Sequence, residues 1–95
     1  MRFRIPDTFT ICGVIHTTTR PEHLVGNEGL KGSFCGFTRT IQIERTLTTD
    51  EAWRTFLHEA LHAANDLYRA GLVDNNIERL ANGIAELLAQ LEPEP

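Results

Sequence analysis

The chain has few of the residues that stabilise small secreted proteins. Its 95 residues include only two cysteines, Cys12 and Cys35. Two cysteines do not make a disulfide framework, and without CxxC spacing they do not suggest a cysteine zinc site. We therefore expect both to be reduced thiols that fill small apolar gaps.

The chain also lacks the segments by which proteins enter membranes or bind nucleic acids. No apolar run approaches about 18 residues, so we expect no membrane span. The N-terminal stretch MRFRIPDTFTICGVIH is broken by Pro6, Asp7 and Thr8, and it lacks the continuous apolar segment of a signal peptide. A formal net charge of −4, with no basic run, argues against a nucleic-acid partner. These absences predict a cytoplasmic protein.

The composition is sufficient for one small domain over residues 1–95. With 41% hydrophobic residues the chain can fold alone, but it has no room for a separate substrate-binding domain. Loose alternation predicts a strand from Phe9 to His16, and GSFCGFTRTIQIERTL offers two more extended pieces, at about 33–37 and 40–45. Because the connections are short, we expect an antiparallel sheet of about three strands within residues 8–46. The fold class is therefore α+β.

Two helices are expected to follow the sheet. Thr48 and Glu51 form a capping box that begins a helix at about 49–70, and Gly71 is a suitable C-cap. Its expected buried stripe consists of Trp53, Phe56, Leu57, Ala60, Leu61, Ala64, Leu67 and Tyr68. A second helix is expected at about 76–91. Its main apolar face consists of Ile77, Leu80, Ile84, Leu87, Leu88 and Leu91, beside a narrower face with small residues at Ala81, Ala85 and Ala89.

The pentapeptide HEALH, residues 58–62, carries the strongest chemical signal. Residues four apart on a helix project from one face, so His58 and His62 can reach one Zn²⁺ at about 2.0–2.1 Å. Both lie at the polar border of the expected stripe, where a ligand pair can face a cleft. Glu59 is then free to accept a proton from water as a general base. The same residues could also be ordinary side chains on a solvated helix face.

A third zinc ligand is expected from the second helix. If that helix packs against the HEALH helix, Glu78 stands opposite the histidines, and Asn82 could hydrogen-bond a ligand. Glu78 has a competing structural role, because with Asn75 as N-cap it would complete a capping box. Asp66 is the main rival for the ligand position. His16 or His23 could donate to a developing oxyanion, although such residues are more often found on strand surfaces and in loops.

HEALH, followed downstream by IERLANGIAELLAQL, resembles the gluzincin zinc metallopeptidases. The likeness covers residues 33–91 and is greatest to minigluzincins and related phage-encoded proteins, with a Glu-x-x-Ala-Asn pattern similar to that of ImmA/IrrE-type proteases. The resemblance implies that His58, His62 and Glu78 are zinc ligands and that Glu59 is the general base. It also implies peptide or protein substrates. An exposed edge strand of the expected sheet could hold the substrate backbone in extended form.

Two other functions stay open at this point. The first is a zinc-stabilised binding or regulatory protein with weak activity or none, because a metal adds much stability to a small domain. The second is a metal-free α+β interaction module in which HEALH occurs by chance.

Overall fold

The computed structural model describes residues 4–24, 26 and 29–91 of the chain. Four strands precede the two long helices: β1 (Thr8–Ile11), β2 (Val14–Thr19), β3 (Gly32–Cys35) and β4 (Thr40–Ile43). The helices are α2 (Thr49–Tyr68) and α3 (Asp74–Gln90). The α+β class expected from the sequence is confirmed. No helix among the described residues is long and apolar enough to cross a membrane.

The sheet has four strands in the order β1-β2-β4-β3, and it is mixed. The single strand expected from Phe9 to His16 is wrong, because the chain reverses at Cys12 and Gly13, and Phe9 pairs with His16 across the resulting hairpin. Cys12 and Gly13 both have positive φ, 54° and 73°, as a two-residue type I′ turn requires. Sequence reasoning missed this turn because cysteine seldom occupies its first position.

The expectation of a purely antiparallel sheet is also wrong. β3 and β4 form the expected antiparallel hairpin, but β2 pairs in parallel with β4. The expectation rested on short connections between sheet neighbours. Here the chain between β2 and β4 includes all of β3, which lies at the sheet edge, and it is therefore long enough to return β4 beside β2 in the same direction.

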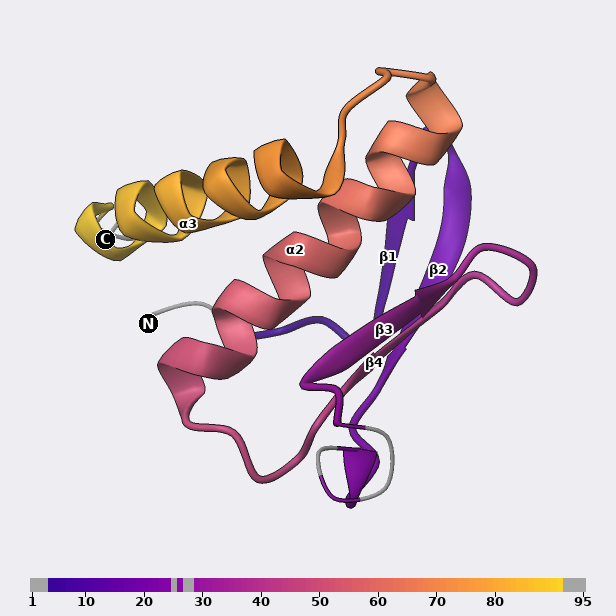
Figure 1. Ribbon diagram of the computed structural model, residues 1–95. Helices are drawn as coiled ribbons and strands as arrows, with labels where there is room; N and C mark the ends of the chain where they lie inside the picture. Colours follow the sequence, from indigo (N-terminus) through magenta and orange to yellow (C-terminus); the bar gives the residue numbers. More distant parts are fainter. Residues whose placement is uncertain (1–3, 25, 27–28, 92–95) are drawn as a thin grey trace.

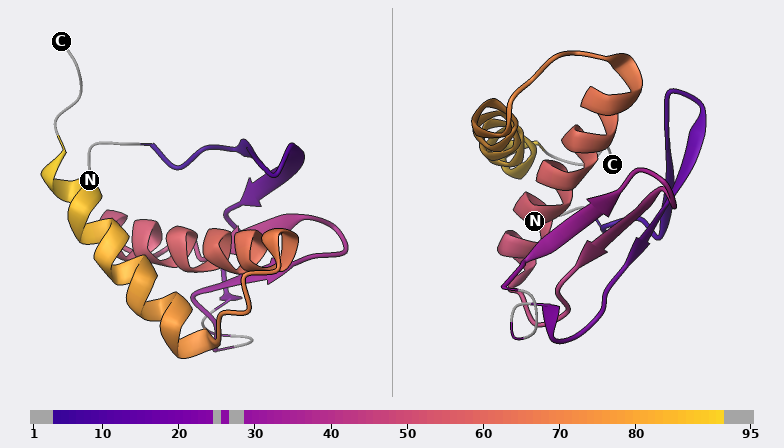
Figure 2. Two further views of the ribbon diagram at one scale, coloured as in Figure 1. Left: turned by 90° about the horizontal axis from the view of Figure 1, so that it is seen from above. Right: turned by 45° about the vertical axis from the view of Figure 1, so that its right-hand side comes forward.

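Helix α2 lies between the sheet and α3, so the molecule has three layers (Figures 1 and 2). The main core lies between α2 and the sheet, and its buried members are Ile41, Ile43, Ala52, Trp53 and Phe56. Only part of the expected stripe of α2 is buried there. Tyr68, expected to be core, is 62% exposed because it is the last residue of the helix.

The second helix packs along the border between its two expected faces. Ile77 of the expected main apolar face is buried together with Ala81 and Ala85 of the narrower face. Leu80 and Leu87 of the main face and Ala89 of the narrower face are exposed. Small side chains allow two helix backbones to approach closely, and α3 rests against α2 in this way. The face of α3 that packs therefore combines one large side chain, Ile77, with the small side chains of Ala81 and Ala85.

The N-cap expected for α2 is confirmed, but the other helix ends differ from the expectation. The Thr48 hydroxyl accepts a hydrogen bond from the Glu51 backbone N–H at 3.3 Å. Helix α2 ends at Tyr68, with Arg69 as its C-cap in a left-handed conformation, two residues before the expected cap Gly71. The Asn65 side chain accepts from the Leu72 backbone N–H at 2.8 Å and donates to the Leu72 carbonyl at 3.2 Å. Both cysteines are free and exposed, so the expected role as gap fillers is wrong.

Candidate metal centre

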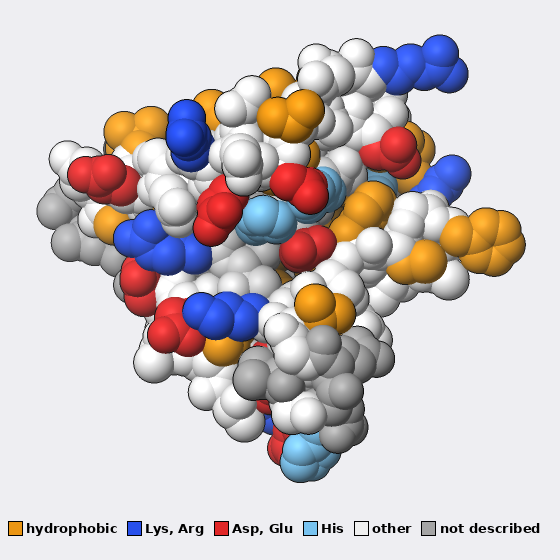
Figure 3. Space-filling view, viewed as in Figure 1, with side chains coloured by type: hydrophobic (Ala, Val, Ile, Leu, Met, Phe, Trp, Pro, Cys, Tyr) orange, Lys and Arg blue, Asp and Glu red, His pale blue; other side chains and the backbone are white. Residues whose placement is uncertain are grey.

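The two histidines of HEALH converge on one point beside α2. Their Nε2 atoms are 3.1 Å apart, and the ring centroids are 4.9 Å apart. The convergence follows from the local helix, because residues one turn apart project from the same face. Both rings are half-buried, and Figure 3 shows histidine side chains at the middle of one face with acidic side chains around them.

The spacing of the two imidazoles fits a shared zinc ion. Two nitrogen ligands at about 2.0–2.1 Å from a tetrahedral Zn²⁺ are about 3.3 Å apart, close to the 3.1 Å separation of the two Nε2 atoms. The same separation is also suitable for a hydrogen bond in which one ring donates and the other accepts. Nitrogen donors with nearby carboxylates form the ligand set that Zn²⁺ prefers.

Glu59 lies beside the pair in a solvent-open hollow of about 410 Å³, which we call the Glu59 hollow. The hollow is lined by residues from β3, α2 and α3, among them Gly32, Thr55, His58, Glu59, Glu78 and Asn82. Burial raises the pKa of the Glu59 carboxyl, the charges of His58 and His62 oppose that rise, and the charge of Asp74 adds to it. A carboxyl with a raised pKa is better matched to accept and release a proton near neutral pH.

Two carboxylates of α3 face the histidine side of α2. Asp74 Oδ1 lies 3.3 Å from His62 Nε2, and no other carboxylate of the described residues lies within ion-pair distance of either imidazole. Glu78, four residues later on α3, lines the Glu59 hollow with His58. Residues four apart share a helix face, so α3 presents both carboxylates to the same side of α2.

The capping role that competed for Glu78 is absent. α3 begins at Asp74 with Val73 as its N-cap, and no side-chain hydrogen bond closes that end. Glu78 therefore lies beyond the first turn, and its carboxylate is not needed for capping. Asn75 lies inside the helix and does not have the expected N-cap position.

The described residues do not complete a metal site by themselves. Within residues 4–24, 26 and 29–91, no group of three or more His, Cys, Asp or Glu side chains is gathered closely enough to hold an ion. Asp66 is exposed and makes no ion pair with His62. The Asn82 side-chain oxygen accepts a hydrogen bond from Arg54 at 3.2 Å. This hydrogen bond links α3 to α2, and the Asn82 oxygen is bonded to Arg54 and not to an imidazole.

Neither candidate for the oxyanion donor lines the Glu59 hollow. His16 was expected at the surface, but it is buried in the core face of β2, where Nδ1 lies 2.9 Å from the Val14 carbonyl and the ring stacks on Phe9. His23 is exposed in the loop after β2, 3.8 Å from Glu22.

Sequence reasoning missed Asp74 and Gly32. The signal for Asp74 was its spacing of four from Glu78, which places both carboxylates on one face. Gly32 begins the edge strand β3, and a Cβ there would lie 2.5 Å from Thr55 Cγ2, 2.9 Å from the Gln42 carbonyl oxygen and 3.6 Å from Glu59 Cγ. Only glycine therefore allows β3 to start directly beside α2 at Glu59.

Comparison of the chain with protein-family profiles, curated proteins and solved structures finds no match in any of the three.

Proposed function

We propose that this protein is a zinc-dependent metallopeptidase. The observation that carries the proposal is the convergence of His58 Nε2 and His62 Nε2 to 3.1 Å, beside a carboxylate whose pKa is raised by burial. His58 and His62 would hold the ion, with Glu78 as the third ligand. Asp74 Oδ1 lies 3.3 Å from the same Nε2 atom of His62, so Asp74 would be a second carboxylate beside the ion and the alternative to Glu78 as its oxygen ligand.

The chemistry divides between the ion and Glu59. Bound Zn²⁺ supplies a Lewis acid that polarises a carbonyl group and lowers the pKa of water. Glu59 accepts a proton from water as the water oxygen bonds to the scissile carbonyl carbon. Glu59 then gives this proton to the amine nitrogen as the C–N bond breaks. One carboxylate therefore serves first as base and then as acid.

The edge strand β3 is a suitable place for the substrate backbone. β3 lies at one edge of the sheet, and its first residue, Gly32, lines the Glu59 hollow. An extended peptide can add to such an edge through main-chain hydrogen bonds. Recognition of this kind favours the backbone over particular side chains, so peptides of many sequences would fit. The free thiols Cys12 and Cys35 are consistent with a cytoplasmic site of action, which is part of the proposal.

Replacement of the base tests the proposal. Wild-type protein, Glu59→Gln and a matched surface control, Glu86→Gln, are loaded with zinc and incubated with a library of internally quenched peptides. We expect wild type and Glu86→Gln to hydrolyse peptides, and Glu59→Gln to be slower by at least about 100-fold. Inductively coupled plasma mass spectrometry should find one zinc ion per molecule in each of the three proteins.

Two results would contradict the proposal. A wild-type protein that keeps zinc but hydrolyses none of the peptides would support the zinc-stabilised binding protein instead. A wild-type protein that takes up no zinc, and whose melting temperature is unchanged by a chelator, would exclude both metal-dependent functions.

A further inference from the structure

A second hollow lies on another face of α2, away from HEALH. It has a volume of about 350 Å³ and is lined by the segment before β1, by β2 and by the start of α2. We call it the Trp53 hollow, and the lining residues that matter here are Arg4, Ile5, Thr18, Arg20, Leu47 and Trp53. Its size is within the range of small-molecule pockets. None of its lining residues lines the Glu59 hollow.

The core-facing side of β2 is unexpectedly polar. His16 and Thr18 are buried and Arg20 is half-buried, whereas Ile15 on the opposite side is 68% exposed. A small protein that places polar side chains inward loses stability unless each one finds a partner. His16 has one in the Val14 carbonyl at 2.9 Å. The other two residues, Thr18 and Arg20, each have a buried side-chain atom without such a partner among the described residues.

Thr18 Oγ1 and Arg20 Nε are buried atoms without a hydrogen-bond partner in the part of the chain that the structure describes, and both residues line the Trp53 hollow. Thr18 is only 8% exposed. Arg20 donates one long hydrogen bond, 3.4 Å from Nη2 to the Glu44 carbonyl oxygen. The Glu44 carboxylate accepts from the Thr46 backbone N–H and hydroxyl instead. The charge of Arg20 therefore has no carboxylate within ion-pair distance among the described residues.

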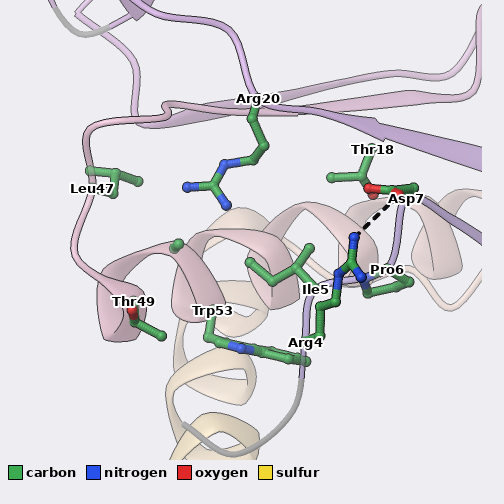
Figure 4. Close-up of a pocket in the computed structure, with 10 residues that line it drawn as sticks. Arg4, Ile5, Pro6, Asp7, Thr18, Arg20, Leu47, Thr49 and Trp53 are labelled. Atoms are coloured by element: carbon green, nitrogen blue, oxygen red, sulfur yellow. Dashed lines mark ion pairs between the residues drawn. The ribbon is translucent and has the colours of Figure 1, made fainter.

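The remaining lining determines the charge and shape of a suitable ligand. Figure 4 shows the Arg20 guanidinium extending from the end of β2 toward α2, with Trp53 across the space, and it marks the Arg4–Asp7 ion pair. That pair, at 3.6 Å, cancels the second positive charge. One uncompensated guanidinium favours a monoanion, and a carboxylate matches its planar set of donors. Ile5, Leu47 and Trp53 provide apolar surface for a hydrocarbon body.

We propose that the Trp53 hollow binds a small monocarboxylate with an apolar body, and that the Arg20 guanidinium and the Thr18 hydroxyl turn toward the ligand to donate hydrogen bonds to its carboxylate. This site does not depend on the proposed peptidase function. The ligand would give these two donors the acceptors that they lack among residues 4–24, 26 and 29–91.

The only tryptophan of the chain lines this hollow, so intrinsic fluorescence reports binding. The probe is sodium hexanoate, compared with its neutral analogue hexanamide, with inorganic phosphate and with sodium chloride at equal ionic strength. We expect a saturable change with hexanoate alone. No saturable change with hexanoate, an equal change with hexanamide, or a change with phosphate in its place would overturn the proposal.

Matched variants locate the site. We expect Arg20→Gln and Thr18→Val to weaken hexanoate binding, Arg20→Gln by at least about tenfold, because a charge-assisted hydrogen bond is lost. Thr19→Val, exposed on the other side of the same strand, should bind like wild type. If circular dichroism shows that Arg20→Gln is unfolded, hexanoate binding by Thr18→Val tests the proposal in its place. Wild-type affinity in Thr18→Val and in a folded Arg20→Gln or Arg20→Lys would contradict the assignment.

Discussion

The Glu59 hollow and the Trp53 hollow are on two faces of one helix, but they are built in different ways. In the Glu59 hollow the key side chains His58 and Glu59 are neighbours in sequence, and a helical spacing of four brings His62 beside His58. In the Trp53 hollow the polar groups come from the segment before β1, from β2 and from α2. The first hollow can therefore be recognised from a motif, and the second only by accounting for buried hydrogen-bonding atoms.

The two hollows also differ in what their polar groups do without a ligand. The imidazoles of His58 and His62 lie 3.1 Å apart and can satisfy one another, and Asp74 adds a contact to His62. Thr18 Oγ1 and Arg20 Nε have no hydrogen-bond partner among the described residues. We infer that the residues around the Glu59 hollow hold one another in place without a ligand. The unpartnered polar atoms at the Trp53 hollow instead lower the stability of the protein until a ligand binds.

The largest expected effect distinguishes the roles of Glu78 and Asp74, the two carboxylates of α3, in zinc binding. If Glu78 is the third ligand, Glu78→Gln should weaken zinc binding by about 100-fold or more, whereas Asp74→Asn, which removes a negative charge beside the ion but not a ligand, should weaken it by about tenfold. Competition with a fluorescent chelator measures both. Hexanoate binding should stay within about twofold of wild type, because the hollows share no lining residue. The reverse order of zinc affinities would identify Asp74 as the ligand.

The next effect concerns the close contact between β3 and α2. Gly32→Ala should lower the free energy of unfolding by about 1–3 kcal/mol, because its Cβ would meet Thr55 and the Gln42 carbonyl oxygen. The control is Gly83→Ala, where a Cβ in α3 meets nothing within 4 Å. That change should raise stability by about 0.5–1 kcal/mol. Equal stability changes in urea denaturation would show that β3 does not approach Glu59 as closely as described.

A smaller effect tests the unpartnered hydroxyl of the Trp53 hollow. Without a ligand, Thr18→Val should stabilise the protein by about 0.5–1 kcal/mol, because valine has nearly the same shape and no hydroxyl to leave unsatisfied. Thr19→Val, on the exposed side of β2, should stay within about 0.5 kcal/mol of wild type. Destabilisation by Thr18→Val alone in thermal melts would mean that the Thr18 hydroxyl already has a partner.

The smallest effect is the pH dependence of Glu59 in metal-free protein. Burial raises the pKa of Glu59 in the folded state above its unfolded value. The folded state therefore holds the proton more tightly, and stability falls as pH rises from the unfolded pKa through the folded pKa. Glu59→Gln removes this loss, so it should be more stable than wild type at pH 7, by less than about 1 kcal/mol, with the difference closing in acid. A difference that stays constant across pH would contradict the raised pKa.

Much of α2 could be predicted from the sequence because its signals are local. The Thr48 cap and the four-residue spacing of His58 and His62 depend on atoms within one or two turns. The end of α2 could not be predicted in the same way, because the Asn65 side chain holds Leu72, seven residues later. The sequence places the end of α2 near Gly71, and the helix ends slightly earlier, at Tyr68 with Arg69 as its C-cap.

The errors in the sheet and in α3 have the same origin in long-range packing. His16 is buried because β2 lies in the interior of the sheet between β1 and β4, an arrangement that the alternation of residues around Phe9 does not reveal. Leu87 is exposed although it belongs to the expected main apolar face of α3, because α3 packs through Ile77, Ala81 and Ala85 and Leu87 lies outside that contact. Both cases depend on which elements meet, and periodicity alone does not contain that information.

The central claim is that His58 and His62 bind one zinc ion, and diffraction at the zinc absorption edge from crystals of zinc-saturated protein tests it most directly. We expect one anomalous peak about 2.0–2.1 Å from both Nε2 atoms and at a similar distance from one carboxylate oxygen of α3. A map with no peak, in which the two imidazoles remain hydrogen-bonded to each other, would contradict the claim.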